Sequence, residues 1–446
     1  MARHRLVPAA LTALALAGAA RAQDRLDIAP DTLRGAAVTV LNAGNPVRAR
    51  TMAEALLHRD AEDRTALSVA MQAALGMEDN AAAAEFGRRL WNRADAPEDR
   101  FQVARLTALA LARDDRFTAA QLWLRRAAQS APDEAARAEI ATNYRTVRQA
   151  NPVHWDFGLS LAPSSNVNGG SSADTILLFG VIELELSEDA KALSGWDYMA
   201  DAKVTWRLSR ADRSLTLLGF GLAVDGYWLS DDSRARAPDF DAEDWRLIDA
   251  DLTLDHRWVP TGTARLAGIQ AELSATTLGG DGYANSLTLA HWRDFRLGEN
   301  DSLHLQAALG RTEYVQSDTL ADRAAINLQW THDWHAGVTA LSLGHGEIWS
   351  DRDDFSYVSN VIAIDHDFGA LTEAVSVSVN LSQEHRDYDT GRTDRTIALG
   401  SMLSFDTAEV YGFIPQLSVT ARQTESSFDR YDSTTLSTRF SFTSAF

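Results

Sequence analysis

The sequence predicts an α + β chain in two parts: an N-terminal helical solenoid of tetratricopeptide-like pairs, followed by a 14-stranded antiparallel transmembrane β-barrel. Two observations carry this prediction. Sequence rich in Ala, Leu and Arg with helical spacing gives way near residue 152 to sequence rich in Ser, Thr, Val and aromatic residues. Beyond that point apolar and polar residues alternate, which is the period-two pattern of a strand with one apolar face.

Composition excludes several classes of function. The 446-residue chain has 42 Lys+Arg against 62 Asp+Glu and a formal charge of −20, so it is not expected to bind nucleic acid. It contains no Cys. Disulfides, thiolate metal sites and cysteine nucleophiles are therefore absent, and no cofactor is expected.

The first 22 residues have the pattern of a secretory signal peptide. Arg3 and Arg5 precede an apolar stretch over 6–20, and Ala20-Arg21-Ala22 forms a small-x-small cleavage site. We therefore expect an exported protein, with its barrel in the bacterial outer membrane and its helical domain in the periplasm.

The predicted helical domain covers residues 23–151. Breaks at Gly44-Asn45-Pro46, Pro97 and Pro132 separate helices of 12–17 residues. The expected helices span 31–43, 46–58, 63–76, 80–92, 98–113, 117–130 and 133–149. The pair from Ala104 to Pro132 has the spacing of the tetratricopeptide signature, although a generic helical bundle is the alternative. Such a stack offers a groove for a protein segment, or it only spaces and stabilises the barrel.

The predicted barrel covers residues 152–446 and has room for 14 strands. Alternation is clearest in 245–259, 324–334 and 371–384. A soluble sandwich would also show this alternation of apolar and polar residues. The connections favour an outer-membrane barrel, because tight turns such as Phe368–Ala370 alternate along the chain with longer connections such as Pro163–Ser194. The last strand, 433–446, places Phe440, Phe442 and Phe446 on its apolar face, and we expect these residues to be the signal for the barrel assembly machinery.

The start of the barrel carries a family resemblance. The segment from Asn151-Pro152-Val153-His154-Trp155 to Asn166-Val167-Asn168 resembles the barrel opening of surface lipoprotein assembly modulators (Slam proteins), and Gly412-Phe413-Ile414-Pro415 through Phe446 resembles their ending. The resemblance implies a translocator with periplasmic repeats and a 14-stranded barrel. It would deliver a client, either a surface lipoprotein or a secreted haem- or metal-acquisition protein, among outer-membrane lipids and lipopolysaccharide.

Candidate site residues follow the first predicted strand. Asn166, Val167 and Asn168 could contact a substrate or partner, or could simply form a turn, which Asn and Gly favour. The sequence has neither a His-Glu-x-x-His motif nor a nucleophile elbow, so we predict no catalytic residues, no metal site and no enzymatic activity. A passive porin with a partner-binding helical domain is the alternative. The client, its lumenal or lateral route, and whether 163–194 plugs the barrel stay open.

Overall fold

The computed structural model describes residues 28–178, 182–261 and 264–444. The predicted signal peptide and Phe446 lie outside these residues. Within the described chain, seven helices precede the first strand: α1 (Pro30–Asn42), α2 (Pro46–Arg59), α3 (Arg64–Gly76), α4 (Asn80–Trp91), α5 (Pro97–Arg113), α6 (Phe117–Gln129) and α7 (Glu134–Ala150). None of the described helices is long and apolar enough to cross a membrane.

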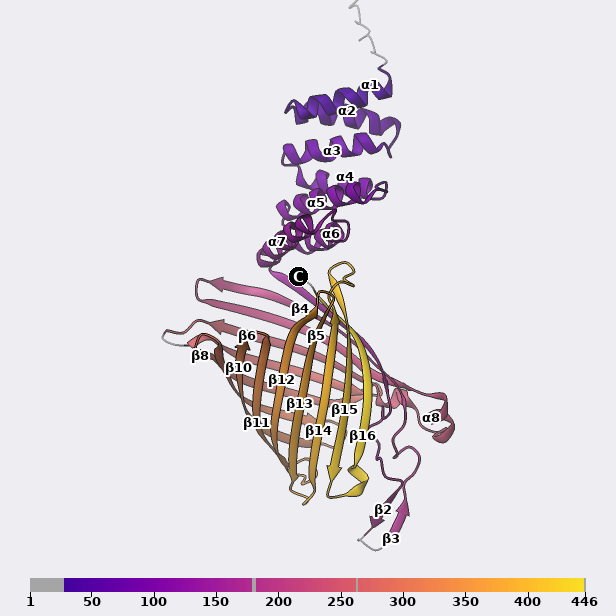
Figure 1. Ribbon diagram of the computed structural model, residues 1–446, viewed down its shortest axis with the longest axis vertical. Coiled ribbons are helices and arrows are strands. Elements are labelled where there is room, and N and C mark those ends of the chain that lie inside the picture. The colour runs from indigo at the N-terminus through magenta and orange to yellow at the C-terminus, as the bar shows by residue number, and fades with distance from the viewer. Residues whose placement is uncertain (1–27, 179–181, 262–263, 445–446) are drawn as a thin grey trace, which may run out of the picture. The chain divides into compact units, whose positions relative to one another are not determined.

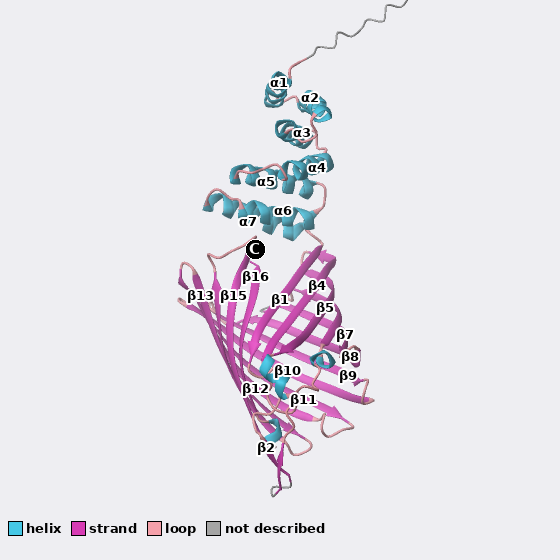
Figure 2. Cartoon of the chain, turned by 90° about the vertical axis from the view of Figure 1, so that its right-hand side faces the viewer, coloured by secondary structure: helices cyan, strands magenta, loops and turns pink. Residues whose placement is uncertain are grey.

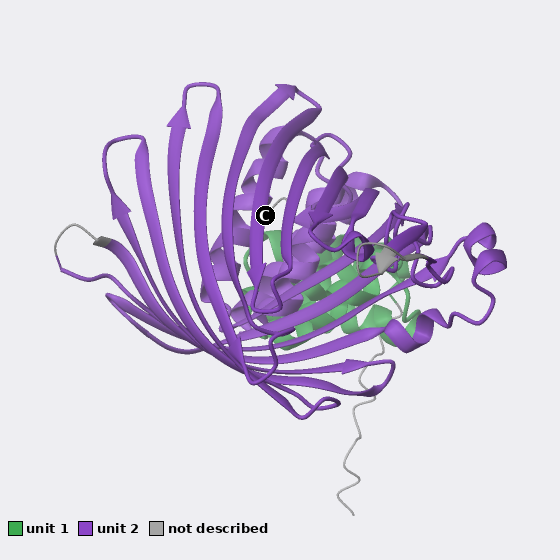
Figure 3. Cartoon of the chain, turned by 90° about the horizontal axis from the view of Figure 1, so that it is seen from below, with its two compact units in different colours: residues 1–94 green, residues 95–446 purple. Residues whose placement is uncertain are grey.

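The chain forms two compact units, divided between Ala94 and Asp95 (Figure 3). In the first unit, α1–α4 pack around small side chains, because alanine lets helix backbones approach closely. The buried core consists of Ala37, Ala49, Ala53, Leu56, Ala66, Val69, Ala70 and Ala73. These paired helices match the predicted helices, whereas their tetratricopeptide character stays a prediction.

An arginine–aspartate contact recurs in this first unit. Arg34 of α1 donates from Nε to Asp63 at 2.7 Å, and Arg50 of α2 donates from Nη1 to Asp79 at 2.6 Å. Each aspartate is also the N-cap of its helix and accepts from the backbone N–H three residues later. These contacts join α1 to the start of α3 and α2 to the start of α4.

We expect Asp79→Ala to lower the free energy of unfolding of this unit by about 1 kcal/mol, because the helix loses its cap. The hydrogen bond from Arg50 holds the pKa of Asp79 below its ordinary value of 3.8. The ion pair therefore stabilises the unit above the unfolded-state pKa and stops doing so as the pH falls through the folded-state pKa. The stability difference between the wild type and Asp79→Asn, measured by circular dichroism on the full chain, should shrink below about pH 4. A difference that stays constant down to pH 2 would contradict this.

Helices α5–α7 belong to the same compact unit as the barrel. The change from helix to strand occurs at Asn151, which is 3% exposed. Its side chain donates to Thr118 Oγ1 at 3.1 Å and accepts from the N–H of Val153 at 3.0 Å, so it joins α6 to the first strand. Sequence composition thus locates the change in secondary structure, whereas the compact units divide three helices earlier, before α5.

The barrel has 14 strands, each antiparallel to its neighbours, and it is closed by pairing of the first strand with the last (Figures 1 and 2). The strands are β1 (Val153–Ser164), β4 (Gly195–Ala211), β5 (Ser214–Leu229), β6 (Leu247–Trp258), β7 (Ala264–Leu278), β8 (Asp281–Arg296), β9 (Asp301–Tyr314), β10 (Thr319–Trp334), β11 (Gly337–Ser350), β12 (Tyr357–Thr372), β13 (Val375–Tyr388), β14 (Thr393–Phe405), β15 (Phe413–Ser426) and β16 (Ser433–Ser444). The predicted fold class is therefore confirmed.

The two ends of the barrel differ in their connections. At the helical end, where α7 leads into β1, β4 and β5 are joined by a turn of two residues, 212–213. At the opposite end, which we call the loop end, the longest connections are 165–194 and 230–246. The first contains the hairpin β2 (Thr175–Leu178) and β3 (Ile182–Glu185), and the second contains α8 (Asp231–Arg236) and the 3₁₀ helix η1 (Ala242–Trp245). Strands β2 and β3 project away from the barrel wall in Figures 1 and 2.

One predicted turn is wrong. The expected turn at Phe368–Ala370 lies inside β12, where Gly369 has a φ of 63° and the register to β13 shifts. The chain reverses four residues later, at Glu373–Ala374, where Thr372 Oγ1 accepts from the N–H of Ala374 at 3.2 Å. A glycine bulge within a strand and a glycine turn have the same local composition, which explains the error.

Candidate functional site

The outer wall of the barrel is apolar. Alternate residues along the strands leave large apolar side chains exposed, including Phe157, Leu159, Phe220, Leu222, Leu252, Leu254, Ile269, Leu273, Leu289, Leu309, Ile326, Leu343, Ile362, Leu381, Leu399 and Phe440. In water such a surface would be unfavourable, and in a bilayer it is the lipid-facing wall.

Two polar pairs, one of a histidine with an aspartate and one of an arginine with an aspartate, mark the edges of this apolar wall on β9 and β10. Toward the helical end, His332 Nδ1 lies 2.9 Å from Asp301. Toward the loop end, Arg311 and Asp322 form two parallel hydrogen bonds of 2.6 and 2.7 Å. The outward positions of β9 between these pairs are all apolar, and they run over residues 303–309.

The inner wall carries polar side chains that lie flat against glycines. A Cβ at Gly158 would collide with the carboxylate of Asp201 on the neighbouring strand, and one at Gly221 would collide with Asp251. Lys203 lies 3.6 Å from the same Asp251 carboxylate. The glycines on this wall therefore leave room for the charged side chains of the neighbouring strands, which lie along the wall.

At the helical end, α6 contacts the rim of the barrel through Arg125. Its guanidinium donates to the carbonyls of Tyr411 and Gly412 at 3.1 and 2.9 Å and to Ser444 Oγ at 2.9 Å. It also stacks over the ring of Phe413 at 4.4 Å. One side chain thus joins α6 to the start of β15 and to the last described residue of β16.

Helix α7 is held to the barrel by a second arginine. Arg207 of β4 donates to the carbonyls of Gln149 and Ala150, each at 2.8 Å. These carbonyls belong to the last turn of α7, where they lack helical partners and where the helix dipole favours a cation. The contacts of Arg125 and Arg207, which we call the rim clamp, fix α6 and α7 beside the barrel mouth.

A cavity of about 590 Å³ lies beneath α7, against β4–β6. Six arginines line it: Arg145, Arg148, Arg207, Arg210, Arg213 and Arg257. Among its described lining residues, Asp212 is the one carboxylate. In a chain with a net charge of −20, this concentration of positive charge at the mouth attracts anionic groups.

The structure places Asn166, Val167 and Asn168 together at the loop end. Asn168 donates to the carbonyls of Asp189 and Lys191 at 3.0 and 2.8 Å. Asn166 is 5% exposed and both donates to and accepts from the backbone of Gly170. Val167 packs against a small core that contains Leu193, Leu229 and Ala237. These side chains hold the connection 165–194 in place, and contact with a substrate stays a prediction.

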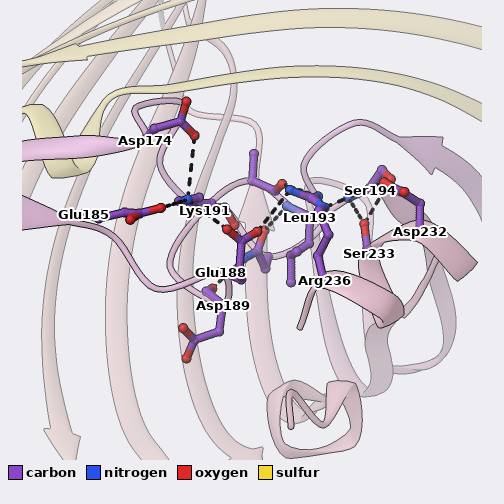
Figure 4. A network of polar contacts seen from close by, with 12 residues as sticks. Asp174, Glu185, Glu188, Asp189, Lys191, Leu193, Ser194, Asp232, Ser233 and Arg236 are labelled. Atoms are coloured by element: carbon purple, nitrogen blue, oxygen red, sulfur yellow. Dashed lines mark hydrogen bonds and ion pairs between the residues drawn. The ribbon is translucent and has the colours of Figure 1, made fainter. Parts of the chain in front are cut away.

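Lys191 is the centre of the polar network in this connection (Figure 4). Its ammonium lies 2.8 Å from Glu188, 3.5 Å from Glu185 and 3.8 Å from Asp174, on both sides of the β2–β3 hairpin. The hydrogen bond to Glu188 raises the pKa of Lys191 and lowers that of Glu188. Arg236 of α8 lies 3.6 Å from Glu188, so the same carboxylate connects the two long loops.

Asn168→Ala is expected to loosen 165–194 without unfolding the barrel. Four hydrogen bonds of the Asn168 side chain to the loop backbone would be lost, each contributing about 0.5–1.5 kcal/mol. Asn168→Asp, which retains only the acceptors, should have an intermediate effect. Limited proteolysis of the protein in detergent measures cleavage within 165–194, and gel mobility without heating reports the barrel. Cleavage equal to that of the wild type would contradict the anchoring role.

Phe440 and Phe442 lie on the outer face of β16, with their rings edge to face at 5.6 Å. Their role in barrel assembly stays a prediction, and Phe446 lies outside the described residues. Within the described chain no group of three or more His, Asp or Glu side chains could hold a metal ion.

Sequence reasoning missed the rim clamp and the arginine-lined cavity. A signal for the cavity was present, because Arg207, Arg210 and Arg213 recur every third residue across one strand end and its turn. Arg125 has no comparable signal, since it binds main-chain carbonyls 286 and 287 residues away in the sequence.

The closed antiparallel barrel with an apolar outer wall defines the class of this protein. It is a 14-stranded transmembrane β-barrel of the outer-membrane type, preceded by a helical region.

No protein-family model and no curated protein sequence matches the chain. Among solved structures, it is similar to a bacterial polysaccharide outer membrane secretin, with 12% identity, coverage of 65% of this chain and 98% of that chain, and a TM-score of 0.37. It is also similar to an anion-selective porin from Comamonas acidovorans, with 12% identity, coverage of 66% and 99%, and a TM-score of 0.33. The MamA RS-1 ArsTM double mutant is similar to 27% of this chain over 76% of its own length, at 17% identity and a TM-score of 0.23. At these identities and TM-scores the likenesses assign no function.

Proposed function

We propose that this chain is an outer-membrane translocator that assists the export or surface display of a client protein without catalysing a covalent reaction. The observation that carries the proposal is the rim clamp, because it holds α6 and α7 directly beside the barrel mouth. A client held by the helices would be delivered to that mouth, whereas a helical region without such a role needs no fixed position there.

The resemblance to surface lipoprotein assembly modulators suggests the class of client, which is a surface lipoprotein or a secreted haem- or metal-acquisition protein. In the proposed orientation the helical end faces the periplasm and the loop end faces the cell exterior, where lipopolysaccharide surrounds the barrel. The barrel assembly machinery would insert the chain by recognising β16 and its terminal aromatic residues.

A passive porin is the second candidate. It is favoured by the inner wall, where glycines such as Gly158 and Gly221 accommodate neighbouring carboxylates, so that charged groups line the lumen. Proteoliposomes distinguish the two candidates. Protease protection of a client that depends on this chain supports translocation, whereas ion conductance unaffected by any client supports the porin.

Breaking the rim clamp should reduce export several-fold. We expect Arg125→Ala/Arg207→Ala to lower the surface exposure of client proteins, identified as those that disappear from the cell surface when the gene is deleted. The physical reason is that α6 and α7 lose their fixed position at the mouth, while the strand pairing of the barrel is unchanged.

The matched control is Arg105→Ala/Arg296→Ala. Arg105 contacts Gln102 and Glu139 within the helices, and Arg296 at the end of β8 donates to the carbonyls of Gly298 and Glu299 in its own turn, outside the arginine-lined cavity. Gel mobility without heating shows whether each barrel has folded. Export by the clamp variant at the level of the control would count against delivery by docked helices.

A further inference from the structure

The seam between β1 and β16 differs from every other junction of the barrel. Leu161 with Phe440 and Ser164 with Ser437 are its two register pairs in the described chain, whereas β1 makes twelve pairs with β4 on its other side. Near the loop end, Ser165 N–H donates to the carbonyl of Leu436 at 3.0 Å. The seam is therefore closed only in its half toward the loop end.

The open half has strands available on both sides. If the ladder continued in the same register, residues 157–160 of β1 would pair with residues 441–444 of β16. Both segments are strands, and both are paired on their other sides, with β4 and β15 respectively. In Figure 2 the two strands separate toward the helices. In the described chain, residues 157–160 and 441–443 have no register pair across the seam, so their backbone donors and acceptors face it.

Two cavities lie along the seam. One of about 590 Å³ borders the open half and is lined by Trp155 and Phe157 of β1, by Phe442 of β16, and by Arg125 and Tyr144 of the helices. The other, of about 380 Å³, is lined mainly by apolar side chains of both strands and reaches from the open half to the register pair of Leu161 and Phe440. The open half of the seam is therefore bordered by a cavity that reaches the helices.

Arg125 also contacts the end of β16 beside the open half. It donates a hydrogen bond to Ser444 Oγ at 2.9 Å and stacks over the rings of Phe413 and Tyr144. The residue that docks the helices on the barrel therefore also links them to the strand that borders the seam.

We infer that the β1–β16 seam is a lateral opening in which an extended segment of the client pairs as a strand with residues 157–160. This inference rests on the proposed function and adds the route. Acyl chains fill an apolar space but cannot bind free backbone N–H and C=O groups inside a membrane, whereas an added strand satisfies them. The helices end at the cavity, so a client leaving them meets this edge first.

The absence of Cys from the chain permits a direct test. Ser160→Cys and Ser441→Cys would face each other if the seam closed in register, and a disulfide between them would lock it. Ser382→Cys/Ala398→Cys places a matched lock between β13 and β14, which are already paired at those positions. We expect oxidation of the seam variant to lower client export at least tenfold, reductant to restore it, and the matched lock to have no effect.

Other outcomes distinguish a failure of the lateral opening from a failure of the proposed function. Export that continues through a fully locked seam would overturn the lateral opening and leave the proposed function standing. Failure of the unlocked variants and the wild type alike to export any client would overturn the proposed function itself.

If the seam lock does not form, a single Cys decides the question. An arrested client carrying scanned cysteines should form disulfides with Ser160→Cys and not with Ser382→Cys. Equal reaction at both positions, or none at either, would overturn the inference.

Discussion

Leu252→Arg is expected to reduce the folded, membrane-inserted fraction of the protein by at least tenfold. Leu252 is 44% exposed and faces outward from the middle of β6. An arginine there would sit in the hydrocarbon at a cost of about 2–4 kcal/mol. The folded fraction is read from the heat-modifiable band of membrane extracts on gels run with and without boiling.

The neighbouring position is the control, because Asp251 faces the lumen, where water can hydrate a charged side chain. Lys203 lies 3.6 Å from Asp251, so an arginine would meet a like charge. The charge-swapped variant Lys203→Asp/Asp251→Arg restores the pair and should fold like the wild type. Equal damage from Leu252→Arg and the swapped pair would show that the outward and inward faces are wrongly assigned.

Deletion of 31–149 is expected to abolish client export and to leave a heat-modifiable barrel. The strand pairing of the barrel involves residues 153–444 and does not include the helices. Client exposure on the cell surface and gel mobility are measured in the same strain, so that a folding failure is distinguished from a loss of capture.

A shorter deletion of 31–94 refines this test, because it removes the first compact unit and retains the rim clamp. If the helices only space the barrel, export should survive when an unrelated helical domain replaces the deleted part. A porin would keep its conductance in both deletions, and client levels at the surface would not change. Export by the longer deletion would remove the binding role proposed for the helices.

Local signals made most of the fold predictable. Pro46 and Pro97 mark helix starts, and Asp63 and Asp79 are N-caps, so the predicted helices agree with the observed ones within two residues. Alternation located the strands less closely, because the expected segment 371–384 begins within β12 and β13 runs over Val375–Tyr388. The turn after β12 was misplaced because Gly369 produces a bulge with the composition of a turn.

The features that carry the functional proposals are not local. Arg125 reaches carbonyls at the other end of the chain, and the open seam depends on which pairs β1 and β16 fail to form. Alternation in β1 and β16 predicts two strands with apolar faces, which is equally consistent with a closed seam and an open one. The anchoring contacts of Asn168 also join residues more than twenty positions apart, so a motif of Asn and Gly could only suggest a turn.

The two polar pairs on β9 and β10 have a consequence for where this protein can reside. Asp301 and Arg311 are ten residues apart on one strand, which corresponds to roughly 34 Å along the strand. At the usual tilt of about 45° the uncharged wall between them is roughly 24 Å tall. A thicker bilayer would draw Arg311 and Asp322 into hydrocarbon, and the mismatch would cost a fraction of a kcal/mol for each ångström. Membrane thickness alone would therefore favour the thin outer membrane and disfavour bilayers several ångströms thicker.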